Sequence, residues 1–479
     1  MTPAFPDGLM AAFDAYEQAL NDDDLATMDQ LFAPGPRTLR GDRGGLLVGH
    51  DQISAFRRVR GGAPARDLAE VRVHVIDDNA AVVTAVTAPR RGGHGLQSQL
   101  WRRVNGSWVI VAAHVSPAPT TFDATVWRIV GAPLVAGAPH GPLAGETVAV
   151  KDLFEVAGYQ VGAGVPAYLA EQPAATRHAD AVARLLDAGA TVRGIAHTDQ
   201  FAYSLAGDNP HYGTPPNAAV PAAVPGGSTS GPATAVALGD ASIGLGTDTA
   251  GSIRVPASYQ GLWGLRSTHG AVPTAGLVAL APDFDTVGLL TRDPHTLVRA
   301  TAALVDDAGV AVPDDVVGLD DVGFDLAAML DPFRTHQGFQ AWQLHGDWIR
   351  AHPDALRGSA AARFEAASRI TPAEDDAARR ALAAARELID ARLGTAVLSL
   401  PSASSPAPRL WATQTEVDAT RQATLQLTCV AAISGRPVVC APANSTPDGP
   451  IGRSYIGPRG SDLALVRWAA QRDAGNRRA

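Results

Sequence analysis

The first part of the chain shows two kinds of hydrophobic periodicity. Apolar side chains recur at helical spacing at Leu9, Ala12, Phe13, Tyr16 and Leu20, and a second amphipathic stretch, DDLATMDQLF, follows an acidic turn. Four later segments alternate polar and apolar positions, as strands do: VRVHVI, AAVVTAVTA, LQSQLWRRV and SWVIVAAHV. The pair Asn105-Gly106, a strong hairpin signal, joins the last two segments. This pattern predicts two helices packed on a curled antiparallel sheet.

A different pattern begins near residue 145. Apolar runs typical of buried strands, such as TVAV and TVRGIA, alternate with helical segments such as ADAVARLLDAGA. That alternation predicts an α/β domain whose central mixed β-sheet is covered by helices. The intervening stretch is rich in Pro, Gly and Ala, so we place a domain boundary between residues 1–118 and 119–479. Residues 311–395 are predicted to form peripheral helices, and residues 396–479 short strands.

Composition and charge narrow the possible partners. The chain has 479 residues, of which 46% are hydrophobic and 18% charged, as in a globular protein with a sizeable core. A net charge of -9 with scattered basic residues excludes the positive surface that nucleic-acid binding requires. The start, MTPAFPDGLM, lacks the pattern of an export signal, and no long uncharged apolar run occurs. We therefore expect neither a nucleic-acid nor a membrane partner.

The cysteine and histidine patterns predict neither a disulfide framework nor a metal site. Cys429 and Cys440 are too few for the former and wrongly spaced for a zinc ribbon or a redox pair. We interpret them as reduced thiols, which favours a cytoplasmic protein. The 13 histidines form no HExxH motif and no Cys/His knuckle.

The lysine content of the chain singles out one residue as a candidate for catalysis. Lys151 is the single lysine among 39 basic residues. A lysine amine can lose its proton when it is buried, whereas arginine remains charged. Lys151 ends the apolar run GETVAVKDLF, so burial in a covered sheet would lower its pKa and make it a usable general base. The alternative is a surface lysine that survived by chance.

Two glycine- and serine-rich turns could supply the groups on which such a base acts. They are PGGSTSGP at residues 225–232 and GLGTDTAGSIRVPAS at residues 244–258. Neither contains the lysine of a phosphate-binding loop, and no GxSxG or SxxK motif is present. From the residues alone, an unusual Ser/Lys hydrolase and a flexible linker both remain open. A Schiff-base lysine for pyridoxal phosphate is a further alternative.

The segments AVKDLF, PGGSTSGPATAVALG, IGLGTDTAGSIRVPASYQGLWGLR and FDTVGLLTRD resemble the amidase signature family over residues 140–300. Within that family, HYGTPPNAAVPAAVPGGS and THGAVPTAGLVALAPDFDTVG are most similar to the indole-3-acetamide amidases of plants. The resemblance implies that Ser252 is the nucleophile, Ser228 the bridging serine and Lys151 the base. It also implies a cis peptide between Gly227 and Ser228, and no metal or organic cofactor.

The same resemblance assigns roles around the nucleophile. The oxyanion hole is implied to come from backbone N–H groups of Thr249, Ala250 and Gly251 and of the nucleophile itself. Asp248 and Arg254 flank this loop, and we expect them to anchor it through hydrogen bonds or an ion pair rather than to react.

The N-terminal segments YEQAL, DQLF, PRTLRGD, FRRVR and LWRRVNGSWVIVAAHVS resemble the NTF2-like (SnoaL-like) α+β cone fold. Within it they look most like the small domain found beside amidases of the cyanuric acid pathway. This resemblance implies a pocket in which Tyr16 and Arg40 could hold a carboxylate. It also implies a homodimer or higher homo-oligomer.

Together these features predict an amidase that cleaves a small carboxamide to a carboxylate and ammonia through an acyl-enzyme. The expected partner is a small-molecule amide substrate. Two alternatives stay open: a hydrolase of urea-like amides of the carboxybiuret or allophanate type, and a non-hydrolytic, amidotransferase-like scaffold subunit.

Overall fold

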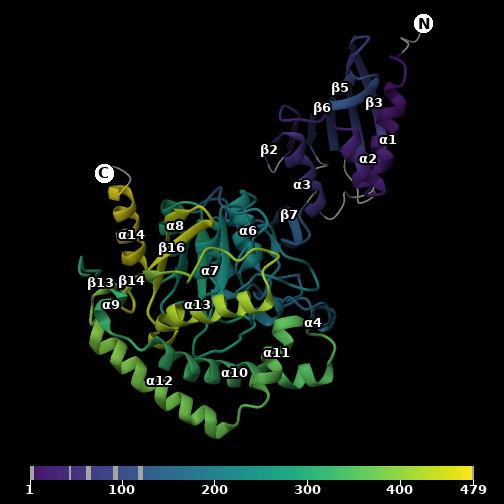
Figure 1. Ribbon diagram of the computed structural model, residues 1–479. Helices are drawn as coiled ribbons and strands as arrows, with labels where there is room; N and C mark the ends of the chain where they lie inside the picture. The colour runs from purple at the N-terminus through teal and green to yellow at the C-terminus, as the bar shows by residue number, and fades with distance from the viewer. Residues whose placement is uncertain (1–4, 43–44, 61–65, 90–94, 117–121, 477–479) are drawn as a thin grey trace. The chain divides into compact units, whose positions relative to one another are not determined.

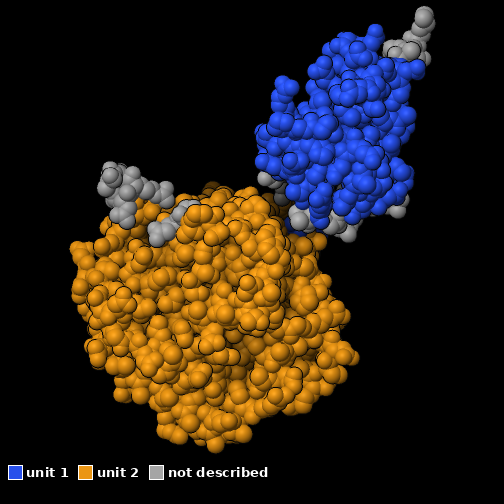
Figure 2. Space-filling view, viewed as in Figure 1, with its two compact units in different colours: residues 1–123 blue, residues 124–479 orange. Residues whose placement is uncertain are grey.

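The computed structural model describes residues 5–42, 45–60, 66–89, 95–116 and 122–476. The chain divides into two compact units, Met1–Asp123 and Ala124–Ala479 (Figure 2). The predicted boundary between residues 118 and 119 lies outside the described residues. Each unit has its own sheet and its own hydrophobic core, so the two are described in turn.

The first unit is an α+β domain built on one six-stranded sheet. Its elements are α1 (Leu9–Asn21), α2 (Leu25–Gln30), α3 (His50–Arg60), β1 (Leu39–Asp42), β2 (Gly45–Val48), β3 (Arg66–Asp77), β4 (Ala80–Pro89), β5 (Gly95–Val104) and β6 (Ser107–Ser116). The strand order is β2-β1-β6-β5-β4-β3, with β1 parallel to β6 and the other neighbours antiparallel. The predicted helices and antiparallel strands are confirmed, whereas the periodicity did not predict β1, β2 or α3.

Local sequence explains the turns and the core of this unit. Asn105 and Gly106 have φ values of 50° and 83°, the left-handed conformation that a two-residue hairpin between β5 and β6 requires. The side chain of Asp24 caps α2 by accepting hydrogen bonds from two backbone N–H groups of its first turn. The apolar face of α1 packs with Phe32 and Trp101 in one buried cluster.

The second unit is built around a ten-stranded mixed sheet. Its strands are β7 (Trp127–Val135), β8 (Thr147–Lys151), β9 (Thr191–Ala196), β10 (Ile243–Asp248), β11 (Trp263–Arg266), β12 (Thr286–Thr291), β13 (Val316–Gly318), β14 (Val397–Pro401), β15 (Val438–Thr446) and β16 (Gly449–Ile456). Their order is β13-β14-β16-β15-β11-β12-β10-β8-β9-β7. Strand β8 is parallel to both β9 and β10. This arrangement confirms the predicted α/β class with a mixed sheet.

Helices cover the sheet on both faces. They are α4 (Pro166–Glu171), α5 (Asp180–Asp187), α6 (Ser230–Leu238), α7 (Arg254–Gln260), α8 (Pro294–Leu304), α9 (Leu319–Val322), α10 (Leu326–Ala351), α11 (Gly358–Ala367), α12 (Pro372–Leu393), α13 (Gln414–Ser434) and α14 (Asp462–Asn476). Adjacent residues of one strand therefore join different clusters: Leu289 packs with the cluster of α5, α8 and α14, and Leu290 with that of α6 and α7. The long helices α10 and α12 pack together and against α13 (Figure 1).

The predicted short strands of residues 396–479 are present, but this region also holds two long helices, α13 and α14. The C-terminal half of α13 is buried without interruption from Thr428 to Ser434. A helix buried on all sides shows no helical hydrophobic period, so the sequence pattern concealed it.

The sheet order brings the two serine-rich turns to the end of β8. Because β8 and β10 are parallel neighbours, Lys151 at the end of β8 and the loop after β10 lie at the same sheet edge. The approach is close: a Cβ on Gly246 of β10 would lie 2.3 Å from the Cγ2 of Thr229. A glycine is therefore required where the first turn, residues 225–232, passes β10.

Candidate active site

Lys151 is the last residue of β8, an interior strand of the sheet. Its side chain is fully buried. Its Nζ is 2.8 Å from the Oγ of Ser228, 2.8 Å from the Oγ1 of Thr247 and 3.1 Å from the Oγ1 of Thr229. The single lysine of the chain is thus not a surface residue, and its amine faces three hydroxyl groups.

The surroundings of Lys151 favour its neutral form. Burial lowers the pKa of Lys151 from its usual range to about 7, although the carboxylates of Asp199, Asp248 and Asp285 oppose the shift. A pKa near 7 leaves a substantial fraction of the amine unprotonated at neutral pH, as a general base requires.

Ser228 is held between Lys151 and a buried loop. The peptide bond between Gly227 and Ser228 is cis. A Cβ on Gly227 would lie 2.4 Å from the Oδ2 of Asp199, so only glycine fits at this position. The carbonyl of Ser228 accepts a hydrogen bond of 2.8 Å from the hydroxyl of Thr198. The backbone and the hydroxyl of Ser228 are therefore both fixed by neighbours.

Ser252 lies in the loop between β10 and α7, next to a small cavity. The residue is 4% exposed and lines this cavity of about 230 Å³ together with Thr249 and Ala250. In the described part of the chain, no hydrogen bond joins its hydroxyl to Ser228 or Lys151. The structure therefore brings Lys151 and Ser228 into contact and places Ser252 at the cavity.

Asp248 organises the loop that carries Ser252. Its carboxylate accepts hydrogen bonds from the N–H groups of Gly251 at 2.9 Å and Ile253 at 3.1 Å. It also forms ion pairs with Arg254 at 2.7 Å and Arg266 at 2.9 Å. Burial by itself would raise the pKa of Asp248, but the two guanidinium groups hold it below its usual range. The expected anchoring role of Asp248 and Arg254 is confirmed, and Arg266 is a further anchor that the sequence did not reveal.

The backbone N–H groups predicted to form the oxyanion hole differ in their hydrogen-bond partners. The N–H of Gly251 donates to Asp248 and is not free for an oxyanion. Among the described residues, no protein acceptor is found for the N–H groups of Thr249, Ala250 or Ser252. The carboxylate that holds the loop thus takes one of the predicted donors and leaves the others available.

Asp199 is a buried acid near the lysine that the sequence analysis did not select. It follows β9, whose end lies beside that of β8 because the two strands are parallel. Its Oδ2 accepts the N–H of Gly207 at 3.0 Å, and its Oδ1 accepts the hydroxyl of Ser230 at 3.3 Å. Burial, and next the charge of Asp208, raise the pKa of Asp199 to about 7.

Tyr16 and Arg40, the residues expected to line an N-terminal pocket, each contact neighbours within the first unit. Tyr16 is 3% exposed and lies edge-on to the Trp101 ring, with centroids 6.5 Å apart. Arg40 forms an ion pair of 2.6 Å with Asp42, two residues further along the same strand, and stacks over Phe56. In the described residues, no hydrogen bond joins Tyr16 to Arg40. The arginine thus has a carboxylate of its own chain as partner.

Comparisons with known proteins match each unit to a family. Residues 2–120 match the AtzH-like family, and residues 131–318 match the Amidase family. Amidase 1 of Arabidopsis thaliana is 32% identical over 409 residues, which cover 72% of this chain and 96% of that protein. The chain belongs to the amidase family. This amidase is accordingly a hydrolase that acts on amide C–N bonds.

Solved structures agree with this assignment. A structure described as a vestigial protein complex, which reveals the evolutionary origins of an s-triazine catabolic enzyme, has a TM-score of 0.63 and 27% identity. The match covers 70% of this chain and 85% of the chain in that structure. An allophanate hydrolase from Kluyveromyces lactis has a TM-score of 0.63 and 25% identity, and covers 69% of this chain and 62% of that chain. The likeness confirms the amidase signature fold.

Relatives also correct the predicted location. Outer envelope protein 64, chloroplastic, of Arabidopsis thaliana is 42% identical over 168 residues, or 35% of this chain and 28% of that protein. Since a relative at that identity is named as an organellar envelope protein, the prediction of a cytoplasmic protein is contradicted. Two buried thiols, Cys429 and Cys440, were too little evidence for a cellular location. None of the helices in the described residues is long and apolar enough to cross a membrane.

Proposed function

We propose that this amidase hydrolyses a small carboxamide to a carboxylate and ammonia through an acyl-enzyme on Ser252. The observation that carries the proposal is the buried amine of Lys151, 2.8 Å from the hydroxyl of Ser228 and with a pKa lowered by burial to about 7. A neutral amine beside a hydroxyl, both buried at the end of β8, is the arrangement that a proton relay needs.

The reaction begins when neutral Lys151 accepts the proton of Ser228, which in turn accepts the proton of Ser252. The Oγ of Ser252 attacks the amide carbonyl, and the backbone N–H groups of Thr249, Ala250 and Ser252 stabilise the oxyanion. The proton returns through Ser228 to the leaving nitrogen, ammonia departs, and water repeats the sequence to release the acid. This relay requires the hydroxyls of Ser252 and Ser228 to come within about 3 Å in the substrate complex.

The test uses Lys151→Ala, Ser228→Ala and Ser252→Ala in the full chain. Each variant is expected to lose ammonia release by at least about 10³-fold while its circular dichroism and melting temperature stay close to those of the wild type. Mass spectrometry of the wild type quenched during turnover should show an acyl adduct on the peptide that contains Ser252. Substantial turnover by Ser252→Ala would overturn the assignment of the nucleophile.

A second substrate class, urea-like amides of the carboxybiuret or allophanate type, has its own support. The AtzH-like match to the first unit and the likeness to an allophanate hydrolase favour it. Ammonia release from indole-3-acetamide, simple aryl and aliphatic amides, biuret and allophanate compares the two classes directly. If the isolated chain released no ammonia from any of them, the amidotransferase-like scaffold would be favoured instead.

The proposal includes a homodimer or higher homo-oligomer. It rests on the AtzH-like unit and on the described complex to which the amidase unit is similar. The mass of the full chain in solution tests this directly, because a chain that remains monomeric at micromolar concentration would contradict it.

A further inference from the structure

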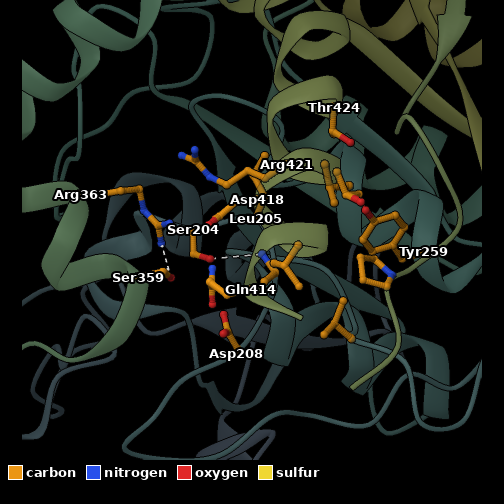
Figure 3. Close-up of a pocket in the computed structure, with 16 residues that line it drawn as sticks. Ser204, Leu205, Asp208, Tyr259, Ser359, Arg363, Gln414, Asp418, Arg421 and Thr424 are labelled. Carbon is orange, nitrogen blue, oxygen red and sulfur yellow. Dashed lines mark hydrogen bonds between the residues drawn. The ribbon is translucent and has the colours of Figure 1, made fainter. Parts of the chain in front are cut away.

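A second cavity adjoins the one that holds Ser252. It has a volume of about 490 Å³, and Figure 3 shows the side chains that line it. Ser204, Leu205 and Arg421 line both this wide cavity and the small one beside Ser252. Arg421 therefore stands where the two cavities meet, within reach of a small molecule whose carbonyl lies at the nucleophile.

Arg421 lies in this cavity without a partner. No carboxylate lies within 4.0 Å of its guanidinium in the described part of the chain, and its Nε is buried without any hydrogen bond. Burial, and next the charge of Arg363, lower the pKa of Arg421 to about 9. A guanidinium that is removed from water and left unpaired is costly, and a planar anion with two acceptor oxygens matches its fork of donors.

Arg363, on α11, reinforces the positive charge. Its Nε donates to the carbonyl of Tyr203 at 2.6 Å, and its Nη2 donates to the hydroxyl of Ser359 at 3.0 Å. These neutral acceptors orient Arg363 without cancelling its charge. Figure 3 shows its side chain reaching into the cavity from the opposite side to Arg421 of α13. The charge of Asp418 raises the pKa of both arginines, so this acid lies near the two cations without forming an ion pair of 4.0 Å or less with either in the described residues.

Two acids also line the wide cavity. Asp208 and Asp418 line the wide cavity and do not line the small one that holds Ser252. Neither forms an ion pair of 4.0 Å or less with Arg363 or Arg421 among the described residues, and burial raises the pKa of Asp208. Arg421 therefore lines both cavities, whereas these two acids line only the wide one.

We propose that Arg421, supported by Arg363, binds a carboxylate of the substrate, so that the substrate is a short amide with a carboxylate at its other end. The inference rests on the proposed function, since it assumes that the carboxamide carbon lies at Ser252. It makes Arg421 a specificity-determining residue and restricts the substrate to a monoamide of a small dicarboxylic acid or an amide of similar shape.

The first experiment compares matched substrates. Oxamate, malonamate, succinamate and glutaramate are each paired with the neutral primary amide of equal chain length. The wild type should favour the best carboxylate substrate by at least about 100-fold in kcat/KM, and Arg421→Met should lower that ratio by at least about 30-fold, mainly through KM. Arg380→Met, a change at an exposed arginine of α12, should leave the ratio unchanged. An equal preference in the wild type, or an unchanged ratio in Arg421→Met, would overturn the proposal.

The second experiment separates this proposal from the proposed function. Binding of the corresponding dicarboxylates, oxalate to glutarate, is measured by calorimetry with Ser252→Ala in the full chain. Adding Arg421→Met should weaken the tightest of these by at least about 10-fold, and adding Arg380→Met should not. If no amide is hydrolysed but Arg421→Met still weakens dicarboxylate binding, the proposed function is contradicted and the carboxylate site is supported. If amides are hydrolysed but Arg421→Met does not weaken dicarboxylate binding, only the proposed carboxylate site is contradicted.

Discussion

The two units treat buried charge in different ways. In the first unit, Glu17 forms a forked ion pair with Arg66, at 3.0 Å, and accepts a hydrogen bond from Gln97. In the second, Lys151 meets hydroxyl groups, and Arg421 has no carboxylate within 4.0 Å in the described residues. A buried charge that is matched within the chain holds the fold together, whereas one left unmatched is available to react or to bind a ligand.

The amidase unit contains both kinds of site within one loop. Asp248 is matched by two arginines and by backbone N–H groups, and it positions the segment that carries Ser252. Lys151 lies nearby with hydroxyl partners only. The contrast therefore separates residues that position the site from residues that we expect to carry the reaction.

The sharpest test of this contrast is Lys151→Arg. Arginine keeps a positive charge but does not become neutral near pH 7, so a proton relay through it fails. We expect kcat to fall by about 10⁴-fold, as measured by ammonia release. The same substitution in reverse at an exposed site, Arg380→Lys, serves as control and should leave kcat unchanged. A fully active Lys151→Arg variant would mean that the charge of this residue, and not its neutral amine, is what matters.

A large effect on stability is expected from Asp248→Asn. The substitution leaves the buried side chains of Arg254 and Arg266 without their shared carboxylate. We expect a loss of about 3 to 5 kcal/mol in the free energy of unfolding, measured with urea. Asp347→Asn, in an exposed pair with Arg350, provides the comparison and should change little. Equal effects at the two sites would show that burial does not distinguish these pairs.

A smaller loss is expected in the first unit. Glu17→Gln keeps the shape of the side chain but removes the charge that Arg66 faces, and should cost about 1 to 3 kcal/mol of stability. Glu70→Gln, in an exposed pair with Arg72, should cost less than about 0.5 kcal/mol. Differential scanning calorimetry of the two variants checks the difference. If Glu17→Gln were neutral, the first unit would not depend on its paired charges.

The smallest expected effect concerns pH. Because the neutral amine of Lys151 is the active form and its pKa is about 7, kcat/KM should fall as pH drops below 7 and level off above it. Asp199→Asn removes an anion that raises the pKa of Lys151, so the midpoint should move to lower pH, by less than about one unit. A pH–rate profile measures the shift. A midpoint that moved to higher pH would contradict the electrostatic account.

Sequence reasoning recovered much of the fold because many of its signals were local. The Asn105-Gly106 turn, the apolar face of α1 and the buried run that ends in Lys151 are each written in a few consecutive residues. The N-terminal pocket of Tyr16 and Arg40 came from resemblance and stays a prediction, and only the structure shows that Arg40 pairs with Asp42 on its own strand. The sequence did not indicate Asp199 because a single acidic residue in a loop forms no recognisable motif.

The sequence by itself determined that the one lysine ends a buried strand and that two serine-rich turns follow it. Only the tertiary structure decided which groups meet there. Strands β8 and β10 are neighbours although nearly a hundred residues separate them, and Arg421 reaches the cavity of Ser252 from a helix much later in the chain. The structure also decided that Asp248 takes the N–H of Gly251. Periodicity records which face of an element is buried, whereas contacts between distant segments depend on the order of strands in the sheet and on the packing of helices against it.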